Sequence, residues 1–330
     1  MTSGKLGVTL PFDDVSLRDH QYLLRDLIDG GYGEVWTGEV SANDGFSPLA
    51  LWAGWYEQLS VSCAVASVFT RGPGVLAMTA ASLAEVAPGR CRFGIGAGSD
   101  VIVANWNGVP FERPYQKVAD TLRFLRQTLA GERADDYPTV HGKGFVLARP
   151  VAVPPRLIVA ALGPRMQELA AAEADGMCLN FLSAGDVTTI RRRCATVNRT
   201  VGEPLEISVR IFVILGTGDA AESAARRFIA GYLTVGVYAK FQEWLGRGPE
   251  LVPMQQAWAA GDRKGATAAI DGQTVRDLIV FGTPAECAAR VQEYFEAGAD
   301  AATLYLLPNR EPLPPGDRVG FLTELAANLG

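Results

Sequence analysis

Short apolar runs alternate with stretches of helical spacing along almost the whole of this 330-residue chain, and this alternation restricts the possible folds more than any other feature. The apolar runs are predicted strands, whereas the stretches between them repeat apolar residues every three to four positions, which is typical of amphipathic helices. Eight strands are predicted, at residues 6–12, 34–39, 61–67, 92–97, 157–161, 176–181, 207–215 and 301–306. Because nearly every strand is followed by a helix, the pattern indicates an α/β protein.

Two α/β folds have this order of elements, the (β/α)₈ barrel and the doubly wound parallel sheet. A doubly wound nucleotide-binding sheet normally carries a glycine-rich phosphate turn after its first strand. The first strand here ends in Leu10 to Asp14, a segment without glycine. We therefore predict a (β/α)₈ TIM barrel, with the doubly wound sheet as the alternative. A single barrel domain is expected over residues 1–330, with insertion segments near 131–155 and 220–280 at its C-terminal face.

The histidine and cysteine content excludes several kinds of catalytic site. The two histidines, His20 and His141, are too far apart for an HExxH zinc motif and are poor candidates for a catalytic triad. The five cysteines form no CxxC pair, and their neighbours predict core packing and no metal site. The chain also has no GxSxG elbow and no Walker A loop. If the chain is an enzyme, an organic cofactor is expected to supply the difficult chemistry.

Charge and hydropathy restrict the partners. The 30 lysines and arginines against 36 aspartates and glutamates give a net charge of −6, which leaves no broad basic surface for nucleic acid. No apolar run approaches the roughly 20 residues of a membrane-spanning helix, and the first residues lack the pattern of a signal peptide. We therefore expect a cytoplasmic protein that acts on a small-molecule substrate and binds neither nucleic acid nor a membrane.

A barrel places its functional residues at the carboxyl ends of its strands. The fourth strand ends in the segment 94–99, GIGAGS, whose glycines would let a flat ligand approach the backbone or would simply form a tight bend. After the fifth strand, Gly163 and Pro164 begin a helix. The amides of Arg165 and Met166 and the positive end of the helix dipole suit an anion there, although every strand-to-helix turn of a barrel ends in a helix terminus.

Two other strand ends carry candidate residues. Glu39 follows the second strand, where a carboxylate can accept hydrogen bonds, move protons or cap a helix. Arg71 follows the third strand and could neutralise an anion or pair with a carboxylate at the rim. Within the third strand, Ala64 and Ala66 are small enough to support a planar ring.

Together these segments resemble the luciferase-like flavin and deazaflavin oxidoreductases, and most closely their actinobacterial F420-dependent branch. Each segment is common by itself, but the ordered set is specific to the superfamily and covers almost the whole chain. The matching segments are EVWTGE at 34–39, DGFSPLAL at 44–51, TRGP at 70–73, PGR at 88–90, GIGAG at 94–98, WNGVPFERP at 106–114, AALGP at 160–164, ADG at 174–176 and FGTPAE at 281–286.

The resemblance implies a barrel that binds the deazaflavin F420, or FMN as the alternative cofactor, and that forms a homodimer. In this family the ring lies against a bulge of the third strand with a non-proline cis peptide, which aligns with Ala64-Val65, and the phosphate lies at the end of the fifth strand. Glu39 is then the candidate catalytic residue. The expected cofactor-binding residues are Glu39, Ala64, Val65, Ser67, Ala97, Gly98, Ser99, Ala161, Gly163, Pro164, Arg165 and Met166.

Two departures from the family pattern bear on the reaction. Several relatives have Asp-His where this chain has Glu39-Val40, so the acid is kept and the histidine is lost. The sugar-phosphate dehydrogenase branch has a glutamate where Ser99 stands, which argues against a sugar-phosphate substrate. Three functions remain: an F420-dependent oxidoreductase, an FMN-dependent luciferase-like monooxygenase, and a deazaflavin-binding protein without catalysis. We expect the first, with an unidentified organic substrate.

Overall fold

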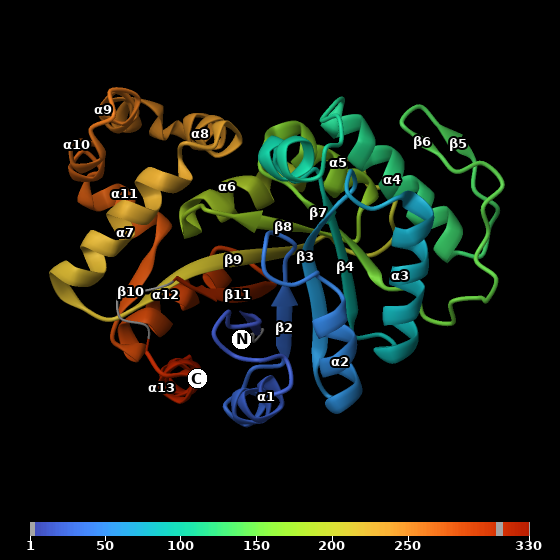
Figure 1. Ribbon diagram of the computed structural model, residues 1–330, viewed down its shortest axis with the longest axis horizontal. Coiled ribbons are helices and arrows are strands. Elements are labelled where there is room, and N and C mark those ends of the chain that lie inside the picture. The colour runs from blue at the N-terminus through green and yellow to red at the C-terminus, as the bar shows by residue number, and fades with distance from the viewer. Residues whose placement is uncertain (1–3, 308–312, 330) are drawn as a thin grey trace.

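Eight parallel strands pair edge to edge and close into a barrel in the computed structural model, which describes residues 4–307 and 313–329. The pairing runs β1-β2-β3-β4-β7-β8-β9-β11 and returns to β1 (Figure 1). The predicted TIM barrel is therefore confirmed, and the doubly wound sheet is excluded. The barrel strands are β1 (Lys5–Thr9), β2 (Glu34–Thr37), β3 (Ser60–Ser67), β4 (Cys91–Gly96), β7 (Arg156–Ala160), β8 (Gly176–Asn180), β9 (Glu206–Leu215) and β11 (Ala301–Leu306).

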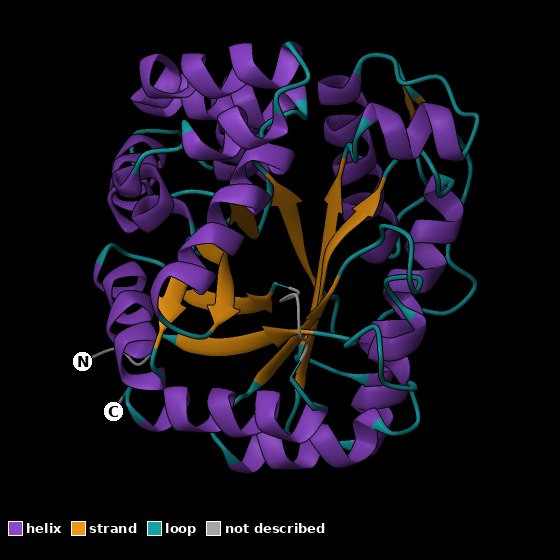
Figure 2. Ribbon diagram, turned by 60° about the vertical axis from the view of Figure 1, so that its left-hand side comes forward, coloured by secondary structure: helices purple, strands orange, loops and turns teal. Residues whose placement is uncertain are grey.

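Helices surround the barrel, as Figure 2 shows. Those that follow the strands at its wall are α1 (His20–Asp29), α2 (Ser47–Trp55), α3 (Pro73–Val86), α4 (Pro114–Leu129), α5 (Pro164–Glu173), α6 (Ala184–Cys194), α12 (Pro284–Glu296) and α13 (Pro315–Ala327). Their buried faces pack on the outward side chains of the strands. In β4, for example, Cys91, Phe93 and Ile95 are buried in this outer core, because alternate residues of a strand point to opposite faces.

The inward side chains of the strands include a buried group of charges near the amino ends of the strands. Arg92 of β4 pairs with Glu34 of β2 at 2.8 Å and with Glu206 of β9 at 2.5 Å. Because β2 and β9 do not neighbour β4, these contacts cross the barrel interior. The carboxyl ends of the strands form the other end of the barrel, and the candidate functional site lies there.

Residues 218–278 form a lobe beside the barrel mouth, at the upper left of Figure 1. The lobe consists of α7 (Gly218–Tyr232), α8 (Gly236–Gln242), the π-helix η2 (Glu243–Arg247), α9 (Gly248–Ala259), α10 (Arg263–Ala268) and α11 (Gly272–Leu278). These helices lie in the region where the sequence predicts an insertion, near 220–280. The insertion predicted near 131–155 contains the hairpin of β5 (Asp136–Tyr137) and β6 (Val140–His141) beside α4.

Besides the β5–β6 hairpin, two further described elements were not predicted from the sequence. The strand β10 (Val280–Gly282) pairs with the end of β9 but is too short to show a pattern. The π-helix η1 (Val101–Trp106) follows the glycine-rich end of β4, where the sequence suggests only a loop. Among the described residues, no helix is both long and apolar enough to cross a membrane.

Candidate functional site

A bulge in β3 forms the floor of the barrel mouth. The pairing of β3 with β4 shifts register between Cys63 and Ala66, and the Ala64-Val65 peptide between them is cis, as the sequence resemblance implies. The glycines of β4 make room for this bulge. A Cβ atom on Gly94 would lie 2.1 Å from the Cys63 carbonyl oxygen, and one on Gly96 would lie 2.7 Å from a methyl group of Val65. The space beside Gly94 and Gly96 is therefore filled by β3.

The bulge is held in place from inside the barrel. Arg210 of β9 donates a hydrogen bond of 2.5 Å from Nη2 to the Ala64 carbonyl oxygen, and its guanidinium group lies over the Tyr305 ring. Trp36, Ile158 and Cys178 pack with Ala64 in a small cluster of their own. Side chains from the strands around the barrel thus fix the bulge as a rigid surface.

The turn after β4 lies next to the bulge. Ser67, at the end of β3, donates a hydrogen bond of 3.0 Å to the Ala97 carbonyl oxygen. Gly98 has a left-handed backbone with φ +73° and is exposed, a conformation that glycine adopts without strain. The Ser99 hydroxyl accepts a hydrogen bond from the Ile102 amide at the start of η1. The predicted residues Ser67, Ala97, Gly98 and Ser99 are therefore brought together at the mouth.

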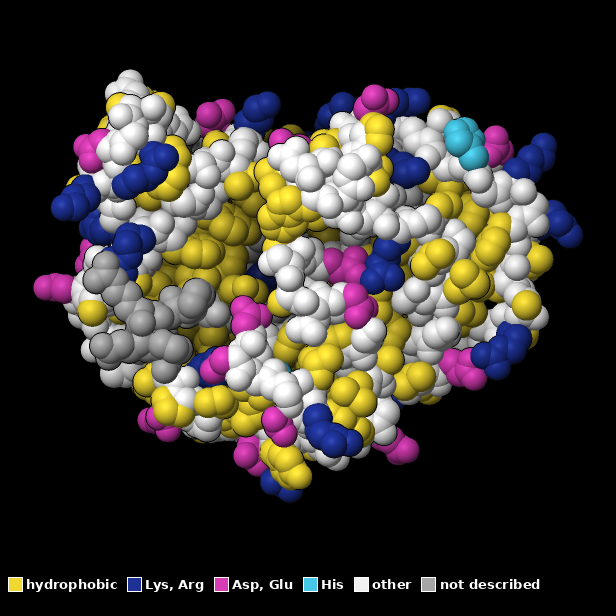
Figure 3. Space-filling model, in the orientation of Figure 1, with side chains coloured by type: hydrophobic (Ala, Val, Ile, Leu, Met, Phe, Trp, Pro, Cys, Tyr) yellow, Lys and Arg dark blue, Asp and Glu magenta, His cyan; other side chains and the backbone are white. Residues whose placement is uncertain are grey.

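Glu39 lies at the mouth in a salt bridge with Arg71. The Arg71 Nη2–Glu39 Oε1 distance is 2.5 Å, Arg71 Nε donates to both carboxylate oxygens, and the Gly45 amide donates to Oε1. Hydrogen bonding to Glu39 raises the pKa of Arg71 above its usual value. These contacts hold the Glu39 side chain in a fixed position. In Figure 3, acidic and basic side chains meet over the loops that follow β2 and β3.

A hollow of about 540 Å³ adjoins this salt bridge. It connects the loops after β2 and β3 with η1, and its lining includes Glu39, Asp44, Ser67, Arg71, Ile102 and Asn107. Such a volume suits a small molecule or part of a larger one. The Glu39 side chain, 16% exposed, is thus accessible to a ligand in the hollow.

The start of α5 offers an anion cradle at the same mouth. Gly163 is the N-cap residue of α5, its backbone is extended, and open space surrounds the position where a Cβ would lie. The Gly163 carbonyl accepts hydrogen bonds from the amides of Met166 and Gln167. Among the described residues, no hydrogen bond involves the Arg165 amide, whereas the Met166 amide donates to Gly163. Of the two amides expected to bind an anion, that of Arg165 is therefore available. The Arg165 guanidinium lies 4.5 Å from the centre of the Tyr115 ring.

One predicted residue has its side chain outside this cradle. Ala161 is fully buried in the outer core, and its amide donates a hydrogen bond to the Cys178 carbonyl oxygen. Pro164 and Met166, by contrast, are half-buried at the start of α5. Ala161 therefore has no exposed atom for a molecule bound at the mouth.

Aromatic side chains pack together where the barrel meets the lobe. Phe181 at the end of β8 packs against Tyr232 of α7 with ring centres 4.7 Å apart, and Tyr232 contacts Tyr238 of α8 at 4.3 Å. Phe212 and Phe228 belong to the same group of rings. Figure 3 shows hydrophobic side chains in the recess between the lobe and the middle of this face. Apolar walls of this kind suit an organic ligand.

Sequence reasoning missed two polar residues at the mouth, Asn180 and Arg210. Asn180 ends β8, and its side-chain amide donates a hydrogen bond of 2.9 Å to the Tyr232 hydroxyl. The side-chain oxygen Oδ1 of Asn180 is buried without a partner in the described part of the chain. Arg210 supports the bulge. A signal for both was present, because Asn180 is a polar residue at the carboxyl end of an otherwise apolar strand and Arg210 is the charged residue within the apolar segment 209–215.

Comparisons with known proteins place this geometry in a family. The family model of the luciferase-like monooxygenases matches residues 4–301. This chain belongs to that family. A 5,10-methylenetetrahydromethanopterin reductase of Methanolobus tindarius is 26% identical over 294 residues, which are 85% of this chain and 88% of the reductase. A Mycobacterium tuberculosis protein, named as a coenzyme F420-dependent oxidoreductase, is 27% identical over 195 residues, 54% of this chain and 56% of that protein.

Two solved structures share the fold of this chain. The coenzyme F420-dependent tetrahydromethanopterin reductase of Methanopyrus kandleri superposes with a TM-score of 0.77 at 18% identity, over 99% of this chain and 98% of the reductase. An F420-dependent secondary alcohol dehydrogenase, solved with an F420-acetone adduct, reaches 0.74 at 14% identity over 99% of both chains. The resemblance seen in the sequence is therefore confirmed for the superfamily, and the relatives include F420-dependent oxidoreductases.

Proposed function

We propose that this protein is an F420-dependent oxidoreductase that acts on an organic substrate at the barrel mouth. The observation that carries the proposal is that one mouth holds both a rigid bulge at Ala64-Val65 and an open helix start at Gly163. The first fits a flat ring and the second fits a phosphate. When bound, the deazaflavin would supply the hydride exchange. The names of the relatives support this choice.

The residues of the chain would position the reactants and keep water out. The Ala64-Val65 bulge would support the ring, and the amide of Arg165 would bind the phosphate. Glu39, fixed by Arg71, would accept a hydrogen bond or hold a proton at a carboxylate oxygen next to the hollow. The aromatic side chains around Tyr232 would exclude water and hold the substrate in line with the ring.

Parallel titrations with F420 and FMN test the cofactor. We expect saturable F420 binding that is at least tenfold tighter than FMN binding. Tighter FMN binding together with oxygen uptake would instead favour a luciferase-like monooxygenase. Saturable F420 binding without turnover over a broad panel of substrates would favour the binding protein without catalysis.

A substitution at the start of α5 tests the phosphate cradle. Gly163→Val fills the open space at Gly163 without a clash, since nothing lies within 4 Å of its added Cβ, and we expect F420 binding to weaken about tenfold or more, about 1.4 kcal/mol. Gly33→Val is the matched control, because Gly33 also has open space around it and lies before β2, away from the carboxyl ends of the strands. Equal F420 affinity in the two variants would contradict the cradle.

The proposed role of Glu39 is tested with Glu39→Gln. We expect weaker cofactor binding or slower turnover, because the amide cannot hold a negative charge or accept a proton as a carboxylate does. Glu85→Gln is the control, since Glu85 pairs with Arg149 at 2.6 Å on the outer side of α3. If Glu39→Gln changes neither F420 affinity nor turnover, Glu39 has no such role.

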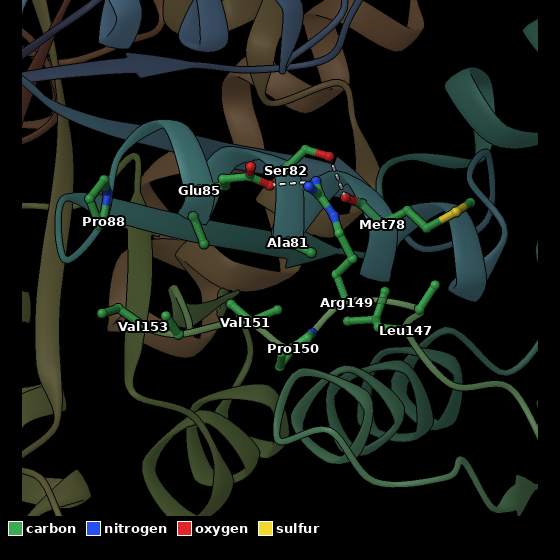
Figure 4. Close-up of a pocket in the computed structure, with 13 residues that line it drawn as sticks. Met78, Ala81, Ser82, Glu85, Pro88, Leu147, Arg149, Pro150, Val151 and Val153 are labelled. Atoms are coloured by element: carbon green, nitrogen blue, oxygen red, sulfur yellow. Dashed lines mark hydrogen bonds and ion pairs between the residues drawn. The ribbon is translucent and has the colours of Figure 1, made fainter.

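We also propose a homodimer that buries the exposed apolar face of α2 and α3. Leu51, Val75, Met78 and Val86 on these helices are each 37–50% exposed. Figure 4 shows the hollow that α3 forms with residues 147–153, with Met78 at one end of its lining. Light scattering should give twice the mass of one chain, and Leu51→Glu should give monomers. Val237→Glu, on the lobe, should leave the mass unchanged; a monomeric wild type would refute the dimer.

A further inference from the structure

A second cavity lies on the lobe, among α7, α9 and α10. It is a groove of about 610 Å³, and the proposed oxidoreductase reaction does not use it. Its lining consists of Ser223, Arg226, Arg227, Trp258, Arg263, Lys264, Thr267 and Ala268. Four of these eight residues carry a positive charge, and none carries a negative charge. Basic side chains gather over α7 and α10 in the upper left of Figure 3.

Three of the four positive charges in the groove lack a carboxylate partner. Of the four basic residues of the groove, Arg226 is the only one that forms an ion pair with a described residue, the Glu222 carboxylate at 2.6 Å. Arg227 donates a hydrogen bond to the neutral Ser223 hydroxyl, and Arg263 donates one to the Trp258 carbonyl oxygen. The Asp262 carboxylate is nearby in sequence but accepts the Gly265 amide as the N-cap of α10. The groove is therefore positive on a chain whose net charge is −6.

The arrangement of these side chains suits a ligand with several phosphate oxygens. Ser223, Arg226 and Arg227 lie at the spacing that places residues on one face of α7, opposite Lys264 and Thr267 of α10. Guanidinium groups bind phosphate through two parallel hydrogen bonds, and lysine adds a point charge. The Ser223 hydroxyl accepts from Arg227 and can donate a further hydrogen bond, whereas the Thr267 hydroxyl already donates to the Arg263 carbonyl oxygen.

We propose that this groove binds an oligophosphate anion with three or more negative charges, either free or as the phosphate chain of a nucleotide. The uncompensated charges of Arg227, Arg263 and Lys264 match that number. Trp258 lies at one end with the Arg263 guanidinium stacked 3.8 Å from its ring centre. A nucleotide base would reach the Trp258 ring by replacing Arg263, whereas a free oligophosphate would leave that stack intact.

Calorimetric titrations at constant ionic strength test the proposal with sodium tripolyphosphate, ATP and citrate. We expect saturable one-to-one binding of tripolyphosphate, at least tenfold weaker binding of citrate, and a tenfold or greater loss of tripolyphosphate affinity in the double variant R227Q/K264Q. Equal affinity for ATP and tripolyphosphate would show that the phosphate chain alone is recognised. Tighter ATP binding that is lost in Trp258→Ala would show base stacking as well.

The control is a double variant that also removes two positive charges, but at another place in the chain. The double variant R133Q/K143Q lies in the 131–155 insertion, at the opposite side of Figure 1, and should keep tripolyphosphate affinity within twofold. Equal losses in the two double variants, or citrate binding as tight as tripolyphosphate, would overturn the proposal, because either shows attraction by overall charge alone. Tripolyphosphate binding that survives R227Q/K264Q but is lost in Gly163→Val would also overturn it and would assign the anion to α5.

Discussion

The charged residues buried near the amino ends of the barrel strands are paired with one another. Arg92 lies between Glu34 and Glu206, and all three side chains are less than 10% exposed. Removal of one member of such a group leaves an uncompensated buried charge, which is far more costly than the loss of an exposed ion pair. At the mouth, Glu39 and Arg71 form a similar ion pair with more exposure, which fits the contact with a ligand proposed for Glu39.

His20 is a buried polar residue whose protonation should affect stability. Its ring is fully buried, Nε2 accepts a hydrogen bond of 2.9 Å from the Phe12 amide, and Nδ1 lies 2.8 Å from the Ser16 carbonyl oxygen. The pair of contacts fixes the neutral ring, with the proton on Nδ1. Burial lowers the pKa of His20 below its usual value of 6.5, although the Ser16 hydrogen bond opposes this shift.

The free energy of unfolding should therefore fall as the pH drops below about 6.5. The unfolded chain takes up a proton at His20 near that pH, while the folded chain resists protonation until the pH reaches its lower pKa. In this window the slope contributed by His20 approaches about 1.4 kcal/mol per pH unit. Urea unfolding between pH 7.5 and 5 should show this slope in the wild type and lose it in His20→Phe. His141→Gln, at an exposed histidine, should keep the slope; an unchanged slope in His20→Phe would contradict the prediction.

At the scale of elements, β3 and β4 specify each other. The bulge of β3 needs the space that Gly94 and Gly96 leave in β4, and Ser67 at the end of β3 holds the turn that follows β4. The two strands therefore form one unit, and the bulge at Ala64-Val65 exists only when both strands are in register. Neither strand alone would predict the shape of the mouth.

Gly94→Ala should disrupt this unit. The added methyl group would lie 2.1 Å from the Cys63 carbonyl oxygen, a backbone atom that can move only if the bulge moves. We expect a loss of about 3 kcal/mol or more in the free energy of unfolding, beyond the usual range for a single substitution. Chemical denaturation measures it, with Gly33→Ala as a control at a glycine with open space. A loss in Gly94→Ala no larger than in the control would show that β4 tolerates a side chain at this position.

At the scale of the whole molecule, one arginine ties the lobe to the barrel. Arg247 of η2 lies 2.7 Å from the Asp186 carboxylate of α6 and 3.1 Å from the Asp277 carboxylate of α11, and its side chain is 12% exposed. Gln242, just before η2, donates a hydrogen bond to the Phe181 carbonyl oxygen at the mouth. The position of the lobe over the mouth thus depends on a few polar contacts as well as on apolar packing.

Arg247→Gln should loosen the lobe without unfolding the barrel. Loss of the ion pairs leaves two acidic groups that favour water, so local opening of the lobe becomes less costly. We expect limited proteolysis within residues 236–260 to become about tenfold faster, which corresponds to about 1.4 kcal/mol of local stability. Lys240→Gln removes an exposed charge from the same lobe and should leave the cleavage rate unchanged. Equal rates in both variants would mean that Arg247 does not hold the lobe.

The sequence by itself determined the order of strands and helices, the barrel, and the segments that lie at its mouth. Apolar periodicity is a local property, so the strand 301–306 and the helical stretch near 220–280 could be read directly from neighbouring residues. The position of Glu39 and Gly163 at the mouth was predicted for the same reason, since each follows a strand and the carboxyl ends of parallel strands share one face.

Only the tertiary structure decided which of those residues meet. The β3 bulge fills the space beside Gly94, Arg210 supports Ala64, and Ala161 is buried. All three findings depend on contacts between strands far apart in the chain. Such contacts are fixed by barrel closure and by the packing of whole side chains, and a pattern of neighbouring residues holds no information about either.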